Sequence, residues 1–451
     1  VETSPNSAVC PVCLGMPGML PVINRRAIDY ALRVALALNC EIQFQNIFAR
    51  KNYFYPDLPK AYQISQYELP LARQGWLDIE LPDGEVTRIR IRRVHMEEDT
   101  GKLTHLEAGG SLVDYNRSGV PLLEIVSEPD IRSGEEARIF TAKIRQIMRY
   151  LGVSSGDMEK GVFRVEPNIS IRPVGSERLG TRTELKNLNS FRALADGTDF
   201  EIKRQAAVLD AGEQVIQETR GWHDTRRATF SQRIKEEADD YRYFAEPDLP
   251  PLLLDEAWIE AAAATLPELP DAKIARYRET LGLSAYDAGV LAEDRQLATF
   301  YDAAVSAGGD PKTMANWMIN DLFALMNEHK QVIDQVQVSP QEVVELGELV
   351  AAQTSNSRTA VKVLAEMFAT GKTAGEIVSE RGLAQISEAE VLAEIIAQIL
   401  RDNESEVAAY KAGNEKLKGW FVGQVMRATR GQANPALVNR LLAEQLSAWP
   451  E

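Results

Sequence analysis

The sequence predicts an α+β protein in which a mixed domain with antiparallel strands comes first and helical domains follow. Two strand patterns support the first part. Apolar and polar residues alternate over 163–172 at the two-residue period of a strand, and two apolar runs flank the turn Asp83-Gly84 as in a hairpin. From about Trp258 onward, apolar residues recur at helical spacing and strand patterns are hard to find. With 451 residues, the chain is long enough for two or three domains, and we expect an all-α domain and a small helical tail domain after the mixed one.

Composition restricts the class of protein. Hydrophobic residues make up 45% and charged residues 26% of the chain, as in soluble globular proteins, and neither a membrane-length apolar run nor a signal peptide occurs. Three cysteines are too few for a disulfide framework, which favours a reducing, cytoplasmic location. A net charge of −16 argues against a general nucleic-acid coat, so any RNA contact must be local. The first residues lack an initiator Met, and we expect the natural start upstream.

The first motif is a pair of cysteines, Cys10-Pro-Val-Cys13, followed by a Gly- and Pro-rich turn. Such a pair supplies half of a tetrahedral zinc site or forms a redox pair. Zinc is the better interpretation because a redox pair usually opens a helix, although a second pair of ligands is missing. Cys40 lies on the apolar side of a helical pattern over 27–38, and we expect it in the core.

The segment 50–66 combines aromatic residues with lysines and prolines. We expect neither helix nor strand over much of its length, because Pro56 and Pro59 favour an extended loop. The segment then either covers the core beneath it with its tyrosine rings or lines a site with its aromatic residues and with Lys51 and Lys60.

The hairpin around Asp83-Gly84 ends in the acidic run His95-Met-Glu97-Glu98-Asp99. A run of this kind is usually solvated, but its oxygens are also ligands that magnesium prefers. Further along, Ser133 and Glu136 form a capping box, which predicts a helix that Gly152 ends.

The alternating stretch 163–172 follows this helix. Its polar face carries guanidinium, carboxylate, amide and hydroxyl groups, from Arg164, Glu166, Asn168, Ser170 and Arg172. The stretch is either an ordinary half-exposed antiparallel strand or a surface suited to anions, sugars or a metal. Because Pro167 lacks an N–H, the strand should be an edge or carry a bulge at that point. A similar polar pattern over 181–190 leads to Ser190, the expected cap of a helix to about Ala211.

In the helical part, helix starts are indicated by caps and capping partners: Ser284 with Asp287, Asp310-Pro311, Ser339-Pro340 with Glu342, and Ser387 with Glu390. Met314, Trp317, Met318 and Leu322 form a stripe that indicates helix packing rather than a cofactor site. Proline-rich residues 266–270 and the turn 381–383 are the natural domain boundaries.

The last segment is basic. From Lys411 to Arg430 there are five cations and one acid, with Trp420 and Phe421 among them. This pattern fits a contact with an RNA backbone and equally fits a cationic face that offsets the remaining acidity.

Taken together, these motifs resemble the B subunit of the tRNA-dependent amidotransferases, which make Gln-tRNA or Asn-tRNA from the mischarged precursor. The resemblance is carried by segments 10–15, 50–56, 60–65, 95–99, 114–117, 120–130, 184–190, 240–244 and 431–435. It implies a heterotrimer with an amidase-like glutaminase (the A subunit) and a small C subunit. The B subunit would phosphorylate the side-chain carboxylate of Glu-tRNA(Gln) or Asp-tRNA(Asn) with ATP and let ammonia displace the phosphate. The implied fold is a cradle domain (1–266), a helical domain (267–383) and a tRNA-binding tail domain (384–451).

The resemblance also implies roles for individual residues. Glu98 and Glu166 would bind Mg²⁺, Arg164 and Asn168 would hold phosphate or substrate, and Lys51, Tyr53 and Lys60 would line an ammonia path. Cys10 and Cys13 would be half of a zinc site, and the tail would contact tRNA through Lys416, Lys418, Arg427 and Arg430.

Two departures from the family pattern keep other interpretations open. The family's metal-binding N-terminal strand, Gly-Leu-Glu-Val-His, is absent, and its Cys-Asp-(Ala/Val)-Asn pattern is replaced by Val165-Glu166-Pro167-Asn168. The chain could therefore be a non-catalytic tRNA-binding scaffold of the same complex. A third hypothesis, independent of the resemblance, is a zinc-knuckle RNA-binding protein.

Overall fold

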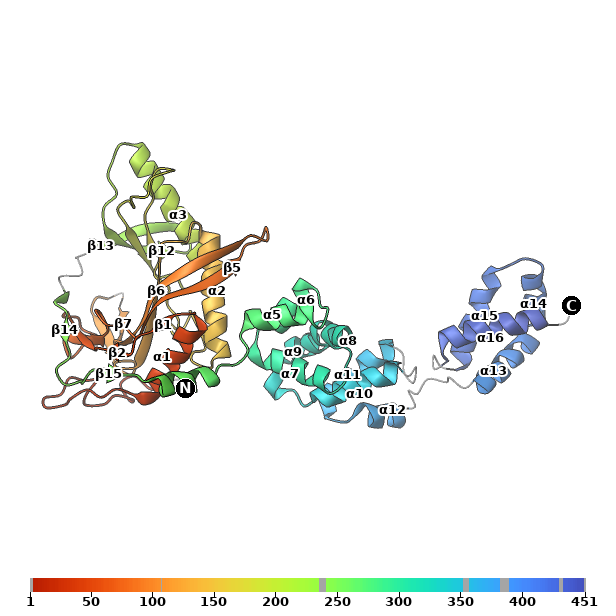
Figure 1. The fold of residues 1–451 in the computed structure, drawn as a ribbon. Helices are drawn as coiled ribbons and strands as arrows, with labels where there is room; N and C mark the ends of the chain where they lie inside the picture. The colour runs from red at the N-terminus through yellow and green to blue at the C-terminus, as the bar shows by residue number, and fades with distance from the viewer. Residues whose placement is uncertain are drawn as a thin grey trace. The chain divides into compact units, whose positions relative to one another are not determined.

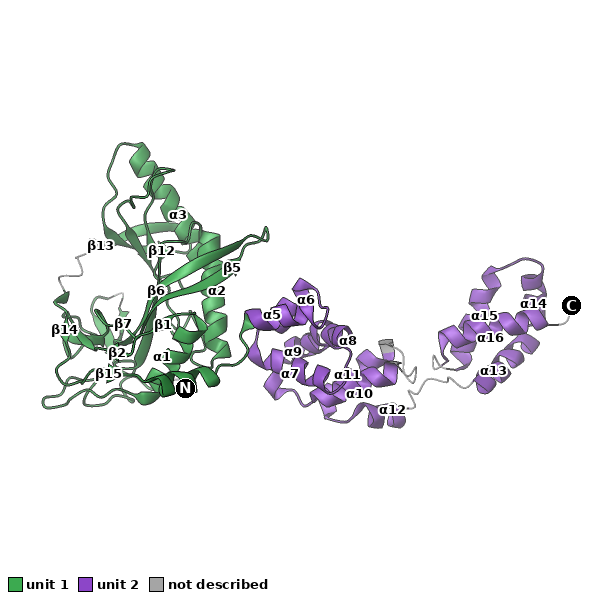
Figure 2. Ribbon diagram, in the orientation of Figure 1, with its two compact units in different colours: residues 1–270 green, residues 271–451 purple. Residues whose placement is uncertain are grey.

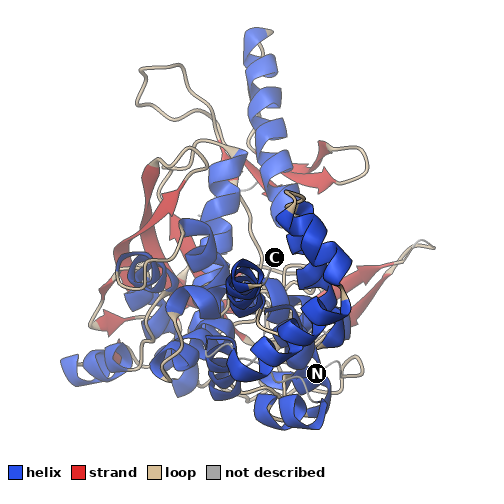
Figure 3. Cartoon of the chain, turned by 90° about the vertical axis from the view of Figure 1, so that its right-hand side faces the viewer, coloured by secondary structure: helices blue, strands red, loops and turns tan. Residues whose placement is uncertain are grey.

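The computed structural model describes residues 3–106, 108–234, 241–351, 357–381, 389–429 and 433–449. The chain forms two compact units, Val1–Pro270 and Asp271–Glu451 (Figure 2). Within the described ranges, every β-strand belongs to the first unit and the second unit is helical. Figure 3 distinguishes the helices from the strands by colour. The predicted α+β class, with antiparallel strands first and helices after them, is confirmed.

The main sheet of the first unit has four antiparallel strands in the order β1-β5-β6-β9 (Figure 1). The strands are β1 (Glu41–Ile42), β5 (Ala72–Glu80), β6 (Val86–Glu98) and β9 (Pro121–Ser127). β5 and β6 form the predicted hairpin, and Gly84 takes the positive φ of 88° that its turn needs.

Two helices pack on this sheet, α1 (Arg25–Ala37) and α2 (Gly134–Tyr150). The buried cluster joins Val34 and Leu38 to Ile91 and Val94 of β6 and to Ile147 of α2. α2 begins as predicted, because the Ser133 hydroxyl accepts a hydrogen bond from the Glu136 N–H at 3.1 Å. Cys40 is buried in the same cluster, as predicted, and burial raises the pKa of its thiol to about 12.

A second sheet has the order β10-β11-β12-β13, and its strands are β10 (Asn168–Ile169), β11 (Thr183–Lys186), β12 (Glu218–His223) and β13 (Ala228–Ile234). β11 and β12 are parallel, whereas the other two pairs are antiparallel. Helix α3 (Phe191–Asp210) packs on this sheet and begins at the predicted cap Ser190.

The predicted strand over 163–172 is much shorter than expected, because only β10 forms ladder pairs. The alternation itself is confirmed: Phe163, Val165 and Ile169 pack into hydrophobic clusters, while the polar side chains between them are exposed. Pro167 has no N–H to donate, and only its carbonyl is bonded, by the Leu185 N–H at 2.9 Å. β10 is an edge strand, as Pro167 predicts.

Three small sheets complete the first unit: β14 (Phe244–Ala245) with β3 (Ala49–Asn52) and β4 (Tyr62–Ser65), β15 (Leu252–Leu253) with β2 (Gln45–Asn46), and β7 (Lys102–His105) with β8 (Ser111–Asp114). Segment 50–66 is therefore not one long loop. Its two ends are the paired strands β3 and β4, and only 53–61 is irregular.

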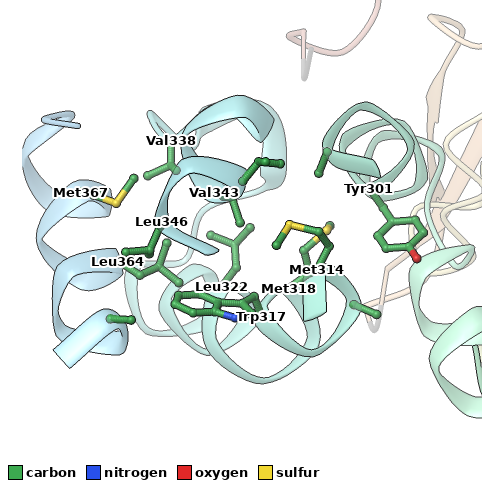
Figure 4. Close-up of a cluster of buried hydrophobic side chains, with 14 of the residues drawn as sticks. Tyr301, Met314, Trp317, Met318, Leu322, Val338, Val343, Leu346, Leu364 and Met367 are labelled. Atoms are coloured by element: carbon green, nitrogen blue, oxygen red, sulfur yellow. The ribbon is translucent and has the colours of Figure 1, made fainter. Parts of the chain in front are cut away.

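Helix α4 (Glu256–Ala264) is the last helix that lies wholly in the first unit. The first helices of the second unit pack around a hydrophobic core of their own (Figure 4). The helices that follow α4 are α5 (Pro270–Glu279), α6 (Ala285–Leu291), α7 (Arg295–Ser306), α8 (Pro311–Asn316), the π-helix η2 (Trp317–Leu322), α9 (Phe323–His329), the 3₁₀ turn η3 (Ile333–Gln335), α10 (Pro340–Ala351), α11 (Ser357–Thr370) and α12 (Ala374–Arg381). Met314, Trp317, Met318 and Leu322 are buried in this core, so the predicted packing role is confirmed.

The predicted starts at Ser284, Asp310 and Ser339 are confirmed, since each of these side chains caps a helix. Ser387 lies outside the described residues.

The last four helices have a separate core. They are α13 (Ala389–Asp402), α14 (Glu404–Lys411), α15 (Lys416–Ala428) and α16 (Pro435–Ala448). Phe421 of α15 is fully buried in this core. None of the described helices combines the length and the apolar character that crossing a membrane requires.

Candidate active site

The end of β6 brings an imidazole and two carboxylates together. His95 and Glu97 are two residues apart and so lie on the same face of the strand, and β9 places Glu124 directly opposite His95. The His95 Nε2 atom lies 3.3 Å from Glu124 Oε2 and 3.8 Å from Glu97 Oε2. His95 and Glu97 are buried, whereas 49% of the Glu124 side chain is exposed. In the part of the chain that the structure describes, this is the one group of three or more His, Cys, Asp or Glu residues with ligand atoms within 4.8 Å of one another.

The contacts within this group set its protonation. Burial lowers the pKa of His95, but the nearby carboxylates of Glu124 and Glu97 outweigh burial and raise it. Partial burial raises the pKa of Glu124, yet the neighbouring imidazolium prevails and lowers it to about 2. These shifts favour a proton on the His95 imidazole, next to the Glu124 carboxylate.

The group also fits a divalent cation. Such an ion can replace this proton, because carboxylate oxygens and a neutral imidazole nitrogen are ordinary ligands. The Nδ1 atom of His95 is buried and has no hydrogen-bond partner, so the imidazole is not saturated by the protein.

Lys51 and a cluster of packed tyrosine rings lie beside this group. We call Tyr53, Tyr241 and Tyr243 the tyrosine wall. Lys51 Nζ lies 3.2 Å from Glu97 Oε1 and 5.2 Å from the centre of the Tyr241 ring. The rings of Tyr53 and Tyr241 pack in a T-shaped arrangement, and Tyr243 stacks on Tyr67 with ring centres 4.3 Å apart. Burial raises the pKa of Tyr243 to about 12, so this hydroxyl stays protonated.

Glu98 points to the other face of β6 and belongs to a second cluster. Its Oε1 atom accepts hydrogen bonds from Lys60 Nζ and, at 2.9 Å, from the Ile64 N–H. The Gln63 side chain connects the two clusters, because its Nε2 donates to the Glu98 carbonyl and its Oε1 accepts from the Tyr53 hydroxyl at 3.1 Å. Of the residues predicted for an ammonia path, Lys51 and Tyr53 thus lie beside Glu97, and Lys60 lies beside Glu98.

The cysteine pair lies next to Glu98. The Sγ atoms of Cys10 and Cys13 are 3.2 Å apart, and Cys13 Sγ packs against Gly119, beside the Glu98 carboxylate. Hydrogen bonds from the Cys13 N–H and thiol lower the pKa of Cys10, and burial raises the pKa of Cys13 to about 11. The two thiols fit one edge of a tetrahedral zinc site. Among the described residues no His, Asp, Glu or third Cys completes such a site.

The polar face of 163–172 meets the end of β6 through one residue. Arg164 Nη2 donates to Asp99 Oδ2 at 2.6 Å. Further along, Glu166 pairs with Lys186 at 3.3 Å, and Asn168 donates to the Glu166 carbonyl. Glu98 and Glu166 are not part of the three-residue group around His95, and their shared metal role stays a prediction.

In the tail, α15 carries Lys416, Lys418 and Arg427. Lys416 and Arg427 are exposed and Lys418 is half-buried. Arg427 lines a shallow hollow with Asp402 of α13, and Trp420 keeps 38% of its surface exposed. Arg430 lies outside the described residues.

Sequence reasoning chose Glu98 from the acidic run and missed His95, Glu97 and Glu124 as a group. The available signal was the two-residue period, which places His95 and Glu97 on one face. Tyr241 and Tyr243 were also missed. They belong to segment 240–244, which carries part of the family resemblance, and their two-residue spacing before β14 was the signal that they share a face.

Comparisons with known proteins point to the same family over nearly the whole chain. Residues 1–260 match the family described as "GatB/GatE catalytic domain", and residues 299–446 match "GatB domain". Three similar proteins are each named as the B subunit of an aspartyl/glutamyl-tRNA(Asn/Gln) amidotransferase. The protein from Moorella thermoacetica is 53% identical over 445 residues, which covers 98% of this chain and 93% of the relative. The protein from Thermodesulfovibrio yellowstonii is 52% identical over 438 residues (97% and 92%), and that from Carboxydothermus hydrogenoformans is 50% identical over 447 residues (98% and 93%).

Proposed function

The chain belongs to the B-subunit family of the aspartyl/glutamyl-tRNA(Asn/Gln) amidotransferases, and we propose that it is the component that activates and amidates the tRNA-bound side chain. The γ-phosphoryl group of ATP passes to a carboxylate oxygen of Glu-tRNA(Gln) or Asp-tRNA(Asn) and leaves ADP. The nitrogen of ammonia then bonds to the acyl carbon, the C–O bond to phosphate breaks, and inorganic phosphate and a proton leave.

The observation that carries this proposal is the His95, Glu97 and Glu124 group at the end of β6. Phosphoryl transfer to a carboxylate brings several negative oxygens together, so it depends on positioning and charge neutralisation. When bound, Mg²⁺ would neutralise these oxygens, and this group would hold it. Following the family resemblance, we also propose a Mg²⁺-binding role for Glu98, which lies on the opposite face of β6, and for Glu166, separately from this group.

Lys51 contributes a fixed positive charge to this site. Burial alone lowers the pKa of its ammonium group, but Glu97 prevails and raises the pKa, so Lys51 stays protonated. A permanently charged lysine cannot act as a base, but it can donate hydrogen bonds to the carboxylate and to the acyl phosphate.

The tyrosine wall protects the two reactive species. Ammonia is inert once it is protonated, and an acyl phosphate is lost if water attacks it. Tyr53, Tyr241 and Tyr243 are packed rings beside Lys51, which supports their proposed role of keeping water out of the ammonia path. Lys60, held by Glu98, is the proposed continuation of this path.

We also propose the partners that the family implies: a glutaminase (the A subunit) that releases ammonia, a small C subunit, and mischarged tRNA, all in the cytoplasm. The cationic residues of α15, together with Arg430, are the proposed tRNA contact of the tail domain. Separate hydrophobic cores in the two helical parts support division into domains at 1–266, 267–383 and 384–451.

The test compares substitutions of two glutamates, one within β9 and one directly after it. Both variants are assayed in the complete complex with the glutaminase and the small C subunit. Glu124→Gln removes a member of the group, whereas Glu128→Gln removes the partner of the exposed Arg92. We expect Glu124→Gln to lower ATP-dependent amidation of mischarged tRNA by about 100-fold or more, as for loss of one transition-state contact. Glu128→Gln should stay within about twofold. Full activity of Glu124→Gln would favour the alternative role of a non-catalytic tRNA-binding scaffold.

A further inference from the structure

Asp99, the residue after β6, connects the two sheet regions of the first unit. Its side chain is buried, and its Oδ2 atom accepts from Arg164 Nη2 at 2.6 Å and lies 3.3 Å from Arg117 Nε. Oδ1 accepts from the Thr100 N–H at 2.9 Å. Arg164 comes from the segment that leads into β10, so this one carboxylate ties the second sheet to the end of β6.

The two arginines are held very differently. Arg117 also donates hydrogen bonds to the carbonyls of Thr100, at 3.0 Å, and Gly101, at 2.8 Å. These contacts hold the Arg117 guanidinium in place beside Asp99. Arg164 makes its hydrogen bond in the described chain through Nη2 alone, and 39% of its side chain is exposed. Its Nε and Nη1 groups therefore keep donors for another acceptor.

We infer that Asp99 is a positioning residue that orients Arg164 toward a phosphoryl group in the site. This inference rests on the proposed function and on the role that the family resemblance implies for Arg164, which is to hold phosphate or substrate. A long arginine side chain loses much rotamer freedom when it binds an anion. A buried carboxylate that is itself held by Arg117 and by a backbone N–H removes that loss before the anion arrives. The planar fork can then present its remaining N–H groups to two oxygens of one phosphoryl group.

The consequence is a dependence between two residues. If Asp99 acts only through Arg164, replacing Asp99 should matter while Arg164 is present and should have no further effect once Arg164 is gone. A structural role predicts losses that multiply instead, because each change would then damage the fold independently.

The experiment is a double-mutant cycle in the complete complex, with KM for ATP and kcat for amidation of mischarged tRNA as readouts. We expect Arg164→Ala to raise KM for ATP by about 30-fold and Asp99→Asn by about 10-fold, and the double variant to match Arg164→Ala within about twofold. Asp130→Asn is the control, because Asp130 accepts three hydrogen bonds from Arg90 away from the site, and it should change KM by less than about twofold.

Each other outcome overturns the inference in a distinct way. Normal kinetics of Asp99→Asn beside a defective Arg164→Ala, or losses that multiply in the double variant, remove the positioning role and leave the proposed function standing. Normal kinetics of Arg164→Ala would instead contradict the proposed role of Arg164 itself. If Asp99→Asn does not fold, Asp99→Glu carries the same cycle, since it keeps the charge and displaces Arg164 by one methylene.

Discussion

Two buried acidic groups in the first unit differ in how well their charges are satisfied. Glu201 of α3 is fully buried against the second sheet. Its carboxylate accepts hydrogen bonds from Arg204, Thr183, Gln205 and Thr229 at 2.7–3.2 Å. The group of His95, Glu97 and Glu124 on the first sheet instead has a buried nitrogen without a partner and a carboxylate that is half exposed.

This difference separates a structural charge from a site. A buried carboxylate that is saturated by donors from its own fold has no bond left for a ligand, and it stabilises the fold only as part of its network. A group in which a protonated imidazole lies between carboxylates can exchange that proton for an ion. Each group contains a buried carboxylate, Glu201 in one and Glu97 in the other, so hydrogen-bond saturation is the informative property.

We expect the largest effect on stability from a substitution of Glu201, whose carboxylate is saturated by hydrogen bonds. Glu201→Gln should lower the free energy of unfolding by about 3 kcal/mol, because it leaves the buried ends of Arg204 and Arg220 without their shared carboxylate. Urea unfolding followed by circular dichroism measures this loss. A change below about 1 kcal/mol would contradict the structural interpretation of Glu201.

The matched change in the unsaturated group should behave in the opposite way. Glu124→Gln should change the free energy of unfolding by about 1 kcal/mol or less, because the side chain is half exposed and its ion pair is screened by water. The same variant should lose amidation by about 100-fold, which corresponds to about 2.7 kcal/mol of transition-state stabilisation. A fall in stability as large as that of Glu201→Gln would place Glu124 among the structural charges.

Features of the fold that depend on residues close together in the sequence could be predicted, whereas contacts between distant strands could not. The β5–β6 hairpin, the caps Ser133 and Ser190 and the edge position of β10 follow from neighbouring residues, and all are confirmed. The site depends on register. Glu124 meets His95 only because β9 pairs with β6 after an excursion through β7 and β8, and no local pattern sets that register.

The same reason explains the choice of Glu98 over Glu97. Adjacent residues of a strand point to opposite faces, and the sequence does not show which face of β6 meets Lys51. The predicted strand over 163–172 is longer than β10 for a different reason. Alternating apolar and polar residues show which side chains point inward, but a strand also requires backbone hydrogen bonds to a neighbour, and only Asn168–Ile169 makes them.

The pH dependence of stability sharpens the comparison further. Burial raises the pKa of Glu201, but its hydrogen bonds to Arg204, Thr183 and Gln205 prevail and lower it below the ordinary value of 4.5. A lowered pKa in the folded state means that the stabilisation is complete above the unfolded pKa and is lost as the pH falls through the folded one. The chain should therefore lose stability below about pH 4.5 more steeply than Glu201→Gln does, as measured by thermal unfolding from pH 6 to pH 3. Parallel curves for the two proteins would show that Glu201 has no lowered pKa.

The smallest expected effect concerns the cations of the tail, which in the part of the chain that the structure describes have none of the hydrogen-bond networks given above for Glu201. Lys416 and Lys418 begin α15, and a cation of this kind contributes to RNA binding by releasing counterions from phosphate. Lys416→Ala should weaken tRNA binding by the complex a few-fold and reduce the slope of log affinity against log salt by about 1, with no change in the rate of amidation at saturating tRNA. Lys312→Ala, on α8 outside the tail, is the control and should leave the slope unchanged. An unchanged slope for Lys416→Ala would show that the cations of α15 only offset the acidity of the chain, because a lysine that meets no phosphate releases no counterion.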